Sequence, residues 1–240
     1  MQVVLLRVGI DTGSGGIHGP LFKDGSFEYI PIPDHYKGRG VDERTYGNAF
    51  GRKGRRLTEY FPEPCRDRFF DQSIHFDPEF ETFTYGDPTT PKVSLQQLQP
   101  GSLLVFYAGL EGWDVSRPPA IYIIGYFEVM RAGLATSFTY KEVRHLFRSN
   151  FHVRHTKVYD DQRDRLVLVK GNRKSRLLTR AVRISVLGKD RRGRPLHKLS
   201  PEMQRRFGGF EGHTSIQRSP PRWVTPEFAE RAARFIRSLK

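Results

Sequence analysis

The chain has 240 residues, a formal net charge of +14, and 37% hydrophobic and 12% aromatic residues. This length and composition exclude a fully disordered chain and suffice for one sizeable core, so we expect a single domain over residues 1–240. The one cysteine, Cys65, excludes an internal disulfide and a zinc site built on paired cysteines.

The charge is distributed unevenly along the chain. Residues 1–140 contain 14 Lys and Arg against 17 Asp and Glu, whereas residues 141–240 contain 26 against 9. This excess of basic residues in the second part of the chain favours a surface that binds nucleic acid over one whose charges only keep the protein soluble. The apolar run in MQVVLLRVGID is too short for a signal peptide, and no segment approaches the roughly 20 apolar residues of a membrane span. We therefore expect a cytoplasmic protein without a membrane partner.

The first half of the chain predicts two strands and a long loop. The apolar run over residues 3–8 predicts a buried strand, and FEYIPI (27–32) predicts a second strand whose prolines place it at a sheet edge. Residues 34–71 are polar, rich in glycine and poor in periodicity. They predict a long surface loop with one short helix, a type of loop that is often functional.

The second half predicts a hairpin followed by helices and short strands. LLVFYAGL and IYIIGYFEVM are apolar at nearly every position and flank the loop EGWDVSRPPA. Thr139 and Glu142 form a capping box ahead of a helix, and FHVRHTKVY (151–159) is expected as strand or loop. RLVLVKG and TRAVRISVLG predict two more strands, while Ser200 and Thr225, each followed by proline, open two helices, the last of them amphipathic.

These elements do not alternate as βαβ units, which argues against a doubly wound sheet. We predict an α+β fold with a small mixed or barrel-like sheet, peripheral helices and a C-terminal amphipathic helix.

The stretch DTGSGGIHG (11–19) is the strongest candidate site in the N-terminal half. It lacks the third glycine of a dinucleotide fingerprint and the Gly-Lys-Ser/Thr of a Walker A loop. Its Asp-Thr-Gly has no second copy to complete the paired carboxylates of an aspartic peptidase. Two interpretations remain. The amides of Gly13, Gly15 and Gly16 bind a phosphate beside Asp11 and His18, or Asp11 simply caps a tight turn.

The predicted pocket around this loop has further polar walls. Tyr85 and Asp87 lie in a turn context (FTYGDP), and Asp87 would act as acid or base if burial shifts its pKa. The catalytic candidates are therefore Asp11, His18, Tyr85 and Asp87.

The histidines do not form a recognisable metal motif. His152 and His155 are three apart in a segment that reads as strand or loop, where they would face opposite sides. His75 and Asp77 would share a face of an extended segment, but no third ligand stands out. We therefore predict no metal site.

Basic and aromatic side chains supply the nucleic-acid candidates. Three basic segments lie within about fifty residues, and the hairpin loop bears Trp113, Asp114 and Arg117. With Tyr107 and Tyr126 on its flanking strands, this loop would form a slot for an extruded base, unless the two tyrosines are simply core. The nucleic-acid-binding candidates are Arg7, Trp113, Arg117, Arg154, His155, Lys157, Lys170, Arg173, Lys174 and Arg176.

Two family resemblances are visible in these motifs. PGSLLVFYAGL and YIIGYFEV resemble the central hairpin of PUA-like domains of the EVE and ASCH kind, with Ser102 in place of the usual Asp. The wider pattern, from LLRVGIDTGSGGIHGPLF through FTYGDP to LVKGNRKSRLL, is similar to the third nucleotide-modification-associated domain family. That resemblance implies a context of DNA base hypermodification but no settled reaction or catalytic residues.

The sequence thus supports a class of protein rather than a reaction. The first hypothesis is a nucleic-acid-binding protein, with DNA favoured over RNA, that engages a modified or extruded base and acts on it or only binds it. The alternative is a hydrolase or transferase of a small nucleotide that uses the DTGSGG loop. The sequence identifies neither a cofactor nor an oligomeric state.

Overall fold

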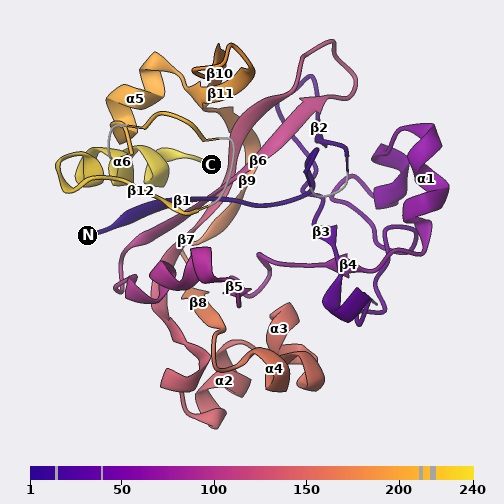
Figure 1. The fold of residues 1–240 in the computed structure, drawn as a ribbon, viewed down its shortest axis with the longest axis vertical. Helices are drawn as coiled ribbons and strands as arrows, with labels where there is room; N and C mark the ends of the chain where they lie inside the picture. Colours follow the sequence, from indigo (N-terminus) through magenta and orange to yellow (C-terminus); the bar gives the residue numbers. More distant parts are fainter. Residues whose placement is uncertain (14–15, 39, 211–212, 217–219) are drawn as a thin grey trace.

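The computed structural model describes residues 1–13, 16–38, 40–210, 213–216 and 220–240. Its centre is a mixed sheet of eight strands (Figure 1). The strands follow one another across the sheet in the order β12 (Arg222–Trp223), β1 (Val3–Arg7), β6 (Leu103–Gly112), β7 (Ala120–Leu134), β8 (Val167–Gly171) and β5 (Thr84–Asp87), with β2 (Gly19–Leu21) paired to β6 and β9 (Arg176–Arg183) to β7.

The sheet confirms the predicted α+β class and mixed character, but it stays open and does not close into a barrel. β1 runs parallel to β6, with Val3 opposite Leu103, whereas β6 and β7 are antiparallel. The first part of β7 pairs with both β6 and β9, and its last part, from Val129 to Leu134, pairs with β8, so this strand of 15 residues links β6 and β9 to β8. Its predicted hairpin with β6 is confirmed, and both strands are buried on both faces.

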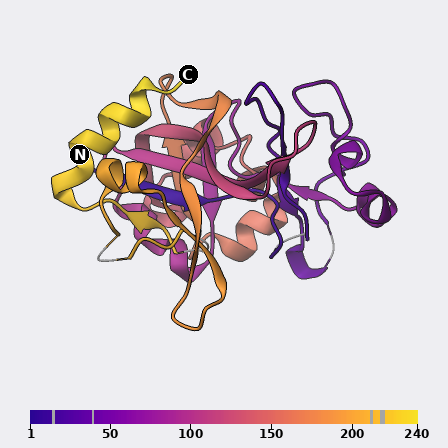
Figure 2. The ribbon, with the colours of Figure 1, turned by 90° about the horizontal axis from the view of Figure 1, so that it is seen from above.

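Helices and two small sheets surround this centre, as Figures 1 and 2 show. The helices are α1 (Glu63–Phe70), α2 (Tyr140–Leu146), α3 (Phe151–Arg154), α4 (Thr156–Gln162), α5 (Pro201–Phe207) and α6 (Pro226–Ser238), with 3-10 turns η1 (Tyr36–Gly38), η2 (Leu57–Tyr60), η3 (Thr90–Gln97) and η4 (Ala135–Ser137). The small sheets are β3 (Ile32–Pro33) with β4 (Ile74–His75), and β10 (Ser185–Lys189) with β11 (Pro195–Leu199).

Three hydrophobic clusters hold these parts together. The largest contains the strands of the main sheet with α5 and α6, the second is built from residues 10–74, and the third from residues 135–168. In Figure 1 these groups lie around the sheet, with α5 and α6 at one side, α1 and the β3–β4 pair at the other, and α2 to α4 below. No helix of the described residues is long and apolar enough to cross a membrane.

Local sequence signals account for several helix starts. The Thr139 side chain accepts from the Glu142 amide while the Glu142 carboxylate accepts from the Thr139 amide, which confirms the predicted capping box. Ser200 caps α5 in the predicted manner, with proline in the first turn. The amphipathic C-terminal helix is confirmed as α6, which buries Ala232 and Ile236.

Two predicted elements are wrong. Residues 151–159, expected as strand or loop, form α3 and the start of α4 because Asn150 caps the turn by accepting from the amide of His152. The second strand expected over 27–32 is reduced to an isolated bridge at Phe27 and to the two residues of β3. Pro31 and Pro33 have no N–H to donate to a longer ladder.

An ion pair fastens the C-terminal helix to the main sheet. Arg237 Nε of α6 lies 2.9 Å from Glu128 Oε2 on β7, and Glu128 is buried. Burial by itself would raise the pKa of Glu128, but hydrogen bonds from Asn172 and Arg237 outweigh it and hold the pKa below its usual value. Glu128 is therefore ionised at neutral pH and stabilised by the folded state.

We expect Arg237→Ala to lower the free energy of unfolding by about 1–2 kcal/mol at pH 7. Arg234→Ala, an exposed position on the same helix, should change it by less than about 0.5 kcal/mol. Because the folded pKa of Glu128 is depressed, its stabilisation is present above about pH 4.3 and is lost as the pH falls through the folded pKa. Urea unfolding between pH 7 and pH 3 should therefore show that the free energies of unfolding of the two variants approach each other as the pH falls. A difference that stays constant would contradict the role of ionised Glu128.

Candidate functional site

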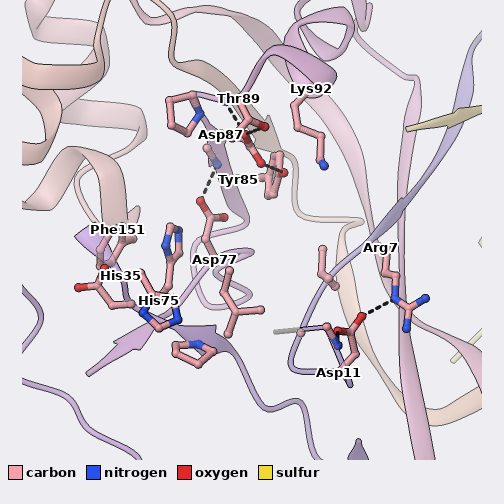
Figure 3. Close-up of a pocket in the computed structure, with 18 of the residues that line it drawn as sticks. Arg7, Asp11, His35, His75, Asp77, Tyr85, Asp87, Thr89, Lys92 and Phe151 are labelled. Atoms are coloured by element: carbon pink, nitrogen blue, oxygen red, sulfur yellow. Dashed lines mark hydrogen bonds and ion pairs between the residues drawn. The ribbon is translucent and has the colours of Figure 1, made fainter. Parts of the chain in front are cut away.

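One pocket of about 990 Å³ lies beside the main sheet, and Val8, Tyr85 and Ile121 of the largest hydrophobic cluster are among its lining residues. Its walls come from the loop after β1, from η1, from β4 and β5, from the start of η3 and from α3. Figure 3 shows how these walls face one another: Arg7 and Asp11 lie on one side, His75 and Phe151 on the other, with Tyr85, Asp87 and Lys92 along the wall between them.

The Arg7–Asp11 end is built by the strand that the sequence predicted. β1 ends at Arg7, and four residues later the Asp11 carboxylate turns back, so that its Oδ2 lies 2.8 Å from Arg7 Nε. Asp11 Oδ1 accepts from the Gly13 amide at 2.7 Å and so caps its own loop. His18 also lines this end, where its Nδ1 lies 3.3 Å from Glu111 Oε2. The predicted capping role of Asp11 and its predicted place at the pocket therefore coexist.

The β10–β11 hairpin reaches the same end of the pocket. His197 of β11 lines it, with Nδ1 3.4 Å from Ser185 Oγ, and burial together with the charges of Arg7 and His18 lowers its pKa. In Figure 2 the hairpin projects from the body of the molecule. Its tip carries the exposed basic side chains Arg191, Arg192 and Arg194.

The β5 wall presents a fixed carboxylate. The buried Tyr85 hydroxyl donates to Asp87 Oδ2 at 2.9 Å, and the Thr89 amide donates to Asp87 Oδ1 at 2.7 Å. Burial, reinforced by the charge of Asp87, raises the pKa of Tyr85 well above its usual value, so its hydroxyl stays a donor. The Thr89 hydroxyl also donates to Asp87 Oδ1, which leaves the carboxylate with three donors.

Lys92, at the start of η3, is a buried lysine that lines the pocket. Its residue is only 7% exposed, and no carboxylate of the described chain lies within ion-pair distance of its ammonium group. Burial lowers its pKa, and the charge of Asp87 opposes that shift only in part. In Figure 3 its nitrogen points toward the space between Tyr85 and Arg7. A buried lysine with no acidic group at ion-pair distance is uncommon.

The opposite wall contains His75, Asp77 and His152. Asp77 Oδ2 accepts from the Gly86 amide at 2.8 Å and from Asn150 Nδ2 at 3.1 Å, while its Oδ1 has no hydrogen-bond partner within the described part of the chain. Burial raises the pKa of Asp77 well above its usual value and lowers the pKa values of both histidines. The His75 ring stacks on Phe151 with centroids 4.0 Å apart.

The structure brings together the four catalytic candidates. Asp11, His18, Tyr85 and Asp87 all line the pocket, as do two further candidates, Arg7 and Gly13. Gly16, with φ +80°, is not among the lining residues, and Gly15 lies outside the described residues.

The hairpin loop does not form the predicted aromatic slot. Tyr107 and Tyr126 are buried in the main core, and Trp113 packs edge-on against Tyr60, with ring centroids 5.4 Å apart. The expectation of a slot between Trp113 and these tyrosines is therefore wrong. Arg117 lies exposed where the loop closes with a hydrogen bond from the Gly112 amide to its carbonyl oxygen.

The remaining nucleic-acid candidates lie outside the pocket, and several are already paired. Arg154 and His155 both contact Asp42, whereas Lys157 is exposed. On the β8–β9 turn, Lys170 donates to the Thr82 carbonyl, Lys174 lies 3.7 Å from Glu128, Arg176 covers the ring of Tyr126, and Arg173 is exposed.

Sequence reasoning missed the pocket residue Lys92, and it set aside His75, Asp77 and His152 because it did not bring the three together. The pair His75 and Asp77 is visible in the motif HFD, but its third neighbour is 75 residues further along the chain. Lys92 lies in the unremarkable segment TPKVSLQQ, and nothing in that segment signals burial of its ammonium group.

Comparison with known families agrees with the resemblance seen in the sequence. A family model described as nucleotide modification associated domain 3 matches residues 2–238, nearly the whole chain. The chain therefore belongs to the nucleotide modification associated domain 3 family, whose description links it to nucleotide modification. No curated protein and no solved structure matched the chain, so the PUA-like character of the β6–β7 hairpin stays a prediction.

Two substitutions at Asp11 separate its two interactions. Asp11→Ala removes both the cap on Gly13 and the ion pair with Arg7, and we expect it to lower the free energy of unfolding by about 2 kcal/mol. Asp11→Asn retains an oxygen for the Gly13 amide and should lower it by about 1 kcal/mol. Urea unfolding of both variants measures the difference. Equal losses would mean that the bond to Gly13 contributes nothing.

Proposed function

We propose that this pocket binds a single nucleotide, extruded from a nucleic-acid strand, as part of a nucleobase-modification system. DNA is the favoured strand, as the family resemblance implies. In this proposal the pocket holds the base and its phosphate, and the basic half of the chain holds the rest of the strand. The family membership supports the link to nucleotide modification.

The buried ammonium group of Lys92 is the observation that carries the proposal. Holding a positive charge in a buried wall without an acidic partner destabilises the fold, so its retention points to an anionic ligand. The nearby guanidinium group of Arg7 adds a second cationic side chain to the same pocket. A phosphate group between them would satisfy donors that are positioned before the ligand arrives.

The other walls suit a nucleobase. A volume of about 990 Å³ lies at the upper end of the range for small-molecule pockets. The Asp87 carboxylate has about four lone-pair sites and receives three hydrogen bonds from Tyr85 and Thr89, so one site remains for a base N–H group. The stacked pair of His75 and Phe151 adds an aromatic wall, the type of surface on which extruded bases stack.

The β10–β11 hairpin is the best-placed surface for the flanking strand. It contributes His197 to the pocket and carries exposed arginines at its tip, whereas the β8–β9 turn contributes nothing to the pocket lining. Cationic side chains on a projecting hairpin can contact phosphates on either side of an extruded nucleotide.

The alternative function uses the same pocket on a free nucleotide. Asp11 and His18, which the sequence proposed for a hydrolase or transferase, line the pocket together with Lys92. The two functions differ in whether the phosphate belongs to a strand. A strand-binding protein should bind a single-stranded oligonucleotide more tightly than the matching mononucleotide, and a small-nucleotide enzyme should not.

Lys92→Met tests the phosphate contact. We expect the variant to bind deoxynucleoside 5′-monophosphates about 10- to 100-fold more weakly, because a hydrogen bond to a charged group contributes about 1.5–3 kcal/mol. Binding of the uncharged nucleosides should be unchanged. Calorimetric titration provides the measurement, with Lys141→Met, an exposed lysine on α2, as the control. The proposal fails if nucleotide and nucleoside bind wild type equally, or if Lys92→Met binds nucleotide as wild type does.

The same variant should be more stable than wild type at pH 7, because the methionine removes a buried charge without an acidic partner. The folded pKa of Lys92 is depressed, so between that value and about pH 10.4 the unfolded chain binds more protons and wild-type stability rises with pH. Lys92→Met lacks this gain. The difference in free energy of unfolding between Lys92→Met and wild type should therefore disappear as the pH approaches 10. If wild type is the more stable of the two at pH 7, burial of the Lys92 charge does not destabilise the fold.

Two matched double variants locate the strand-binding surface. Arg191→Ala with Arg192→Ala, and Arg173→Ala with Lys174→Ala, remove the same charge from the hairpin tip and from the β8–β9 turn respectively. We expect affinity for single-stranded DNA to fall steeply with salt, and the hairpin variant to weaken binding and reduce the salt slope more than the turn variant does. Fluorescence anisotropy across a salt series measures both quantities. A larger effect at the turn would move the strand to that surface.

A further inference from the structure

We infer that His75, Asp77 and His152 form a binding site for one divalent transition-metal ion at the wall of the pocket. One ligand atom from each side chain can be chosen so that all lie within 4.8 Å of one another. Ligand atoms about 2.1 Å from a metal lie about 3–3.5 Å apart, so a small closure completes the geometry. The inference concerns the metal alone and does not depend on the proposed nucleotide.

Asp77 provides the strongest evidence that this site binds a cation. Its side chain is buried, and its Oδ1 has no hydrogen-bond partner among the described residues. Its Oδ2 is satisfied by the Gly86 amide and by Asn150. A buried carboxylate oxygen without a donor is costly, and a metal ion in contact with it would remove that cost.

His152 is oriented as a metal ligand would be. Its Nδ1 lies 2.7 Å from the amide oxygen Oε1 of Gln162. With the ring hydrogen on Nδ1, where this oxygen accepts it, Nε2 keeps its lone pair for a metal ion. Nε2 lies 3.6 Å from Asp77 Oδ2. A hydrogen bond from the far ring nitrogen is the usual device that fixes the tautomer and the orientation of a ligating histidine.

His75 reaches the site from a different element. It is the last residue of β4, whose pairing with β3 places it beside the pocket. Its ring stacks on Phe151 and meets the His152 ring edge-on, with centroids 4.8 Å apart. No described residue hydrogen-bonds its ring nitrogens, and one of them is among the ligand atoms that lie within 4.8 Å of one another.

A set of supporting contacts holds the three side chains together. A Cβ at Gly86 would lie 2.8 Å from Asn150 Oδ1 and 2.9 Å from His152 Cδ2, so only glycine allows β5 to approach this closely. Asn150 uses its amide nitrogen for Asp77 and its oxygen for the backbone of His152. It therefore connects two of the three ligands directly.

Two imidazoles and one carboxylate define the class of metal. Imidazole ligands suit zinc, iron, copper and nickel rather than calcium or magnesium. Three protein ligands leave further coordination positions, and here they would face the pocket. The arrangement fits Zn²⁺ or Fe²⁺ with solvent or a ligand in the remaining positions.

Titration of chelator-treated protein with Co²⁺ and with Zn²⁺ tests the site. We expect one equivalent of metal to bind wild type, with visible d–d absorption from Co²⁺ and a rise in melting temperature with either ion. Asp77→Asn, which preserves the shape of the side chain, and His75→Gln should each weaken binding by at least about 100-fold. His145→Gln replaces an exposed histidine on α2 and should bind as wild type does.

Gln162→Leu probes the support of His152 and should weaken binding about 10- to 100-fold. Circular dichroism confirms that each variant is folded before it is titrated. Stoichiometric binding that is lost in the Asp77 and His75 variants, and retained in the His145 variant, supports the site. Absence of binding to wild type, or binding that folded Asp77→Asn and His75→Gln both retain, overturns it.

Discussion

The buried carboxyl group of Asp77 holds together three segments that are distant in the sequence. One of its oxygens accepts from the backbone of Gly86 on β5 and from Asn150 at the start of α3. Those bonds place β4, β5 and α3 at a common wall, which is also the wall of the pocket. Burying an acidic group to join three segments costs desolvation free energy. Its retention is explained if the same group also serves the site.

The pocket consequently has two chemically different sides. Lys92 and Arg7 provide cationic donors on one side, and the histidines with Asp77 provide nitrogen and carboxylate ligands on the other. In Figure 3 Tyr85 and Asp87 lie on the wall that connects these sides. A ligand long enough to span the pocket would therefore place its anionic group at the lysine and another part of itself near the metal ligands. A nucleotide has these two parts.

Local sequence signals predicted the elements that depend on neighbouring residues. The β6–β7 hairpin, the capping box at Thr139 and the helix start at Ser200 each follow from a few adjacent side chains. The position of Asp11 beside a pocket also followed, because a buried strand that ends in a glycine-rich turn brings its next polar residue to a sheet end.

The features that sequence could not predict depend on distant contacts. Whether Lys92 is buried without an acidic partner is decided by how η3 packs, and not by its own segment. The strand or loop predicted for residues 151–159 hid His152, because the helical turn capped by Asn150 is what turns its ring toward Asp77. Counting charges likewise did not reveal that Lys174 and Arg154 already face buried acids.

A crystal structure of the protein with Co²⁺ and a deoxynucleoside 5′-monophosphate would test the central claim, that one pocket holds a nucleotide beside a metal ion. The account predicts a single anomalous peak between His75, Asp77 and His152, and a phosphate group within hydrogen-bonding distance of Lys92 Nζ in the same pocket. A nucleotide bound elsewhere on the surface, with the pocket unoccupied at saturating concentrations of both, would contradict it.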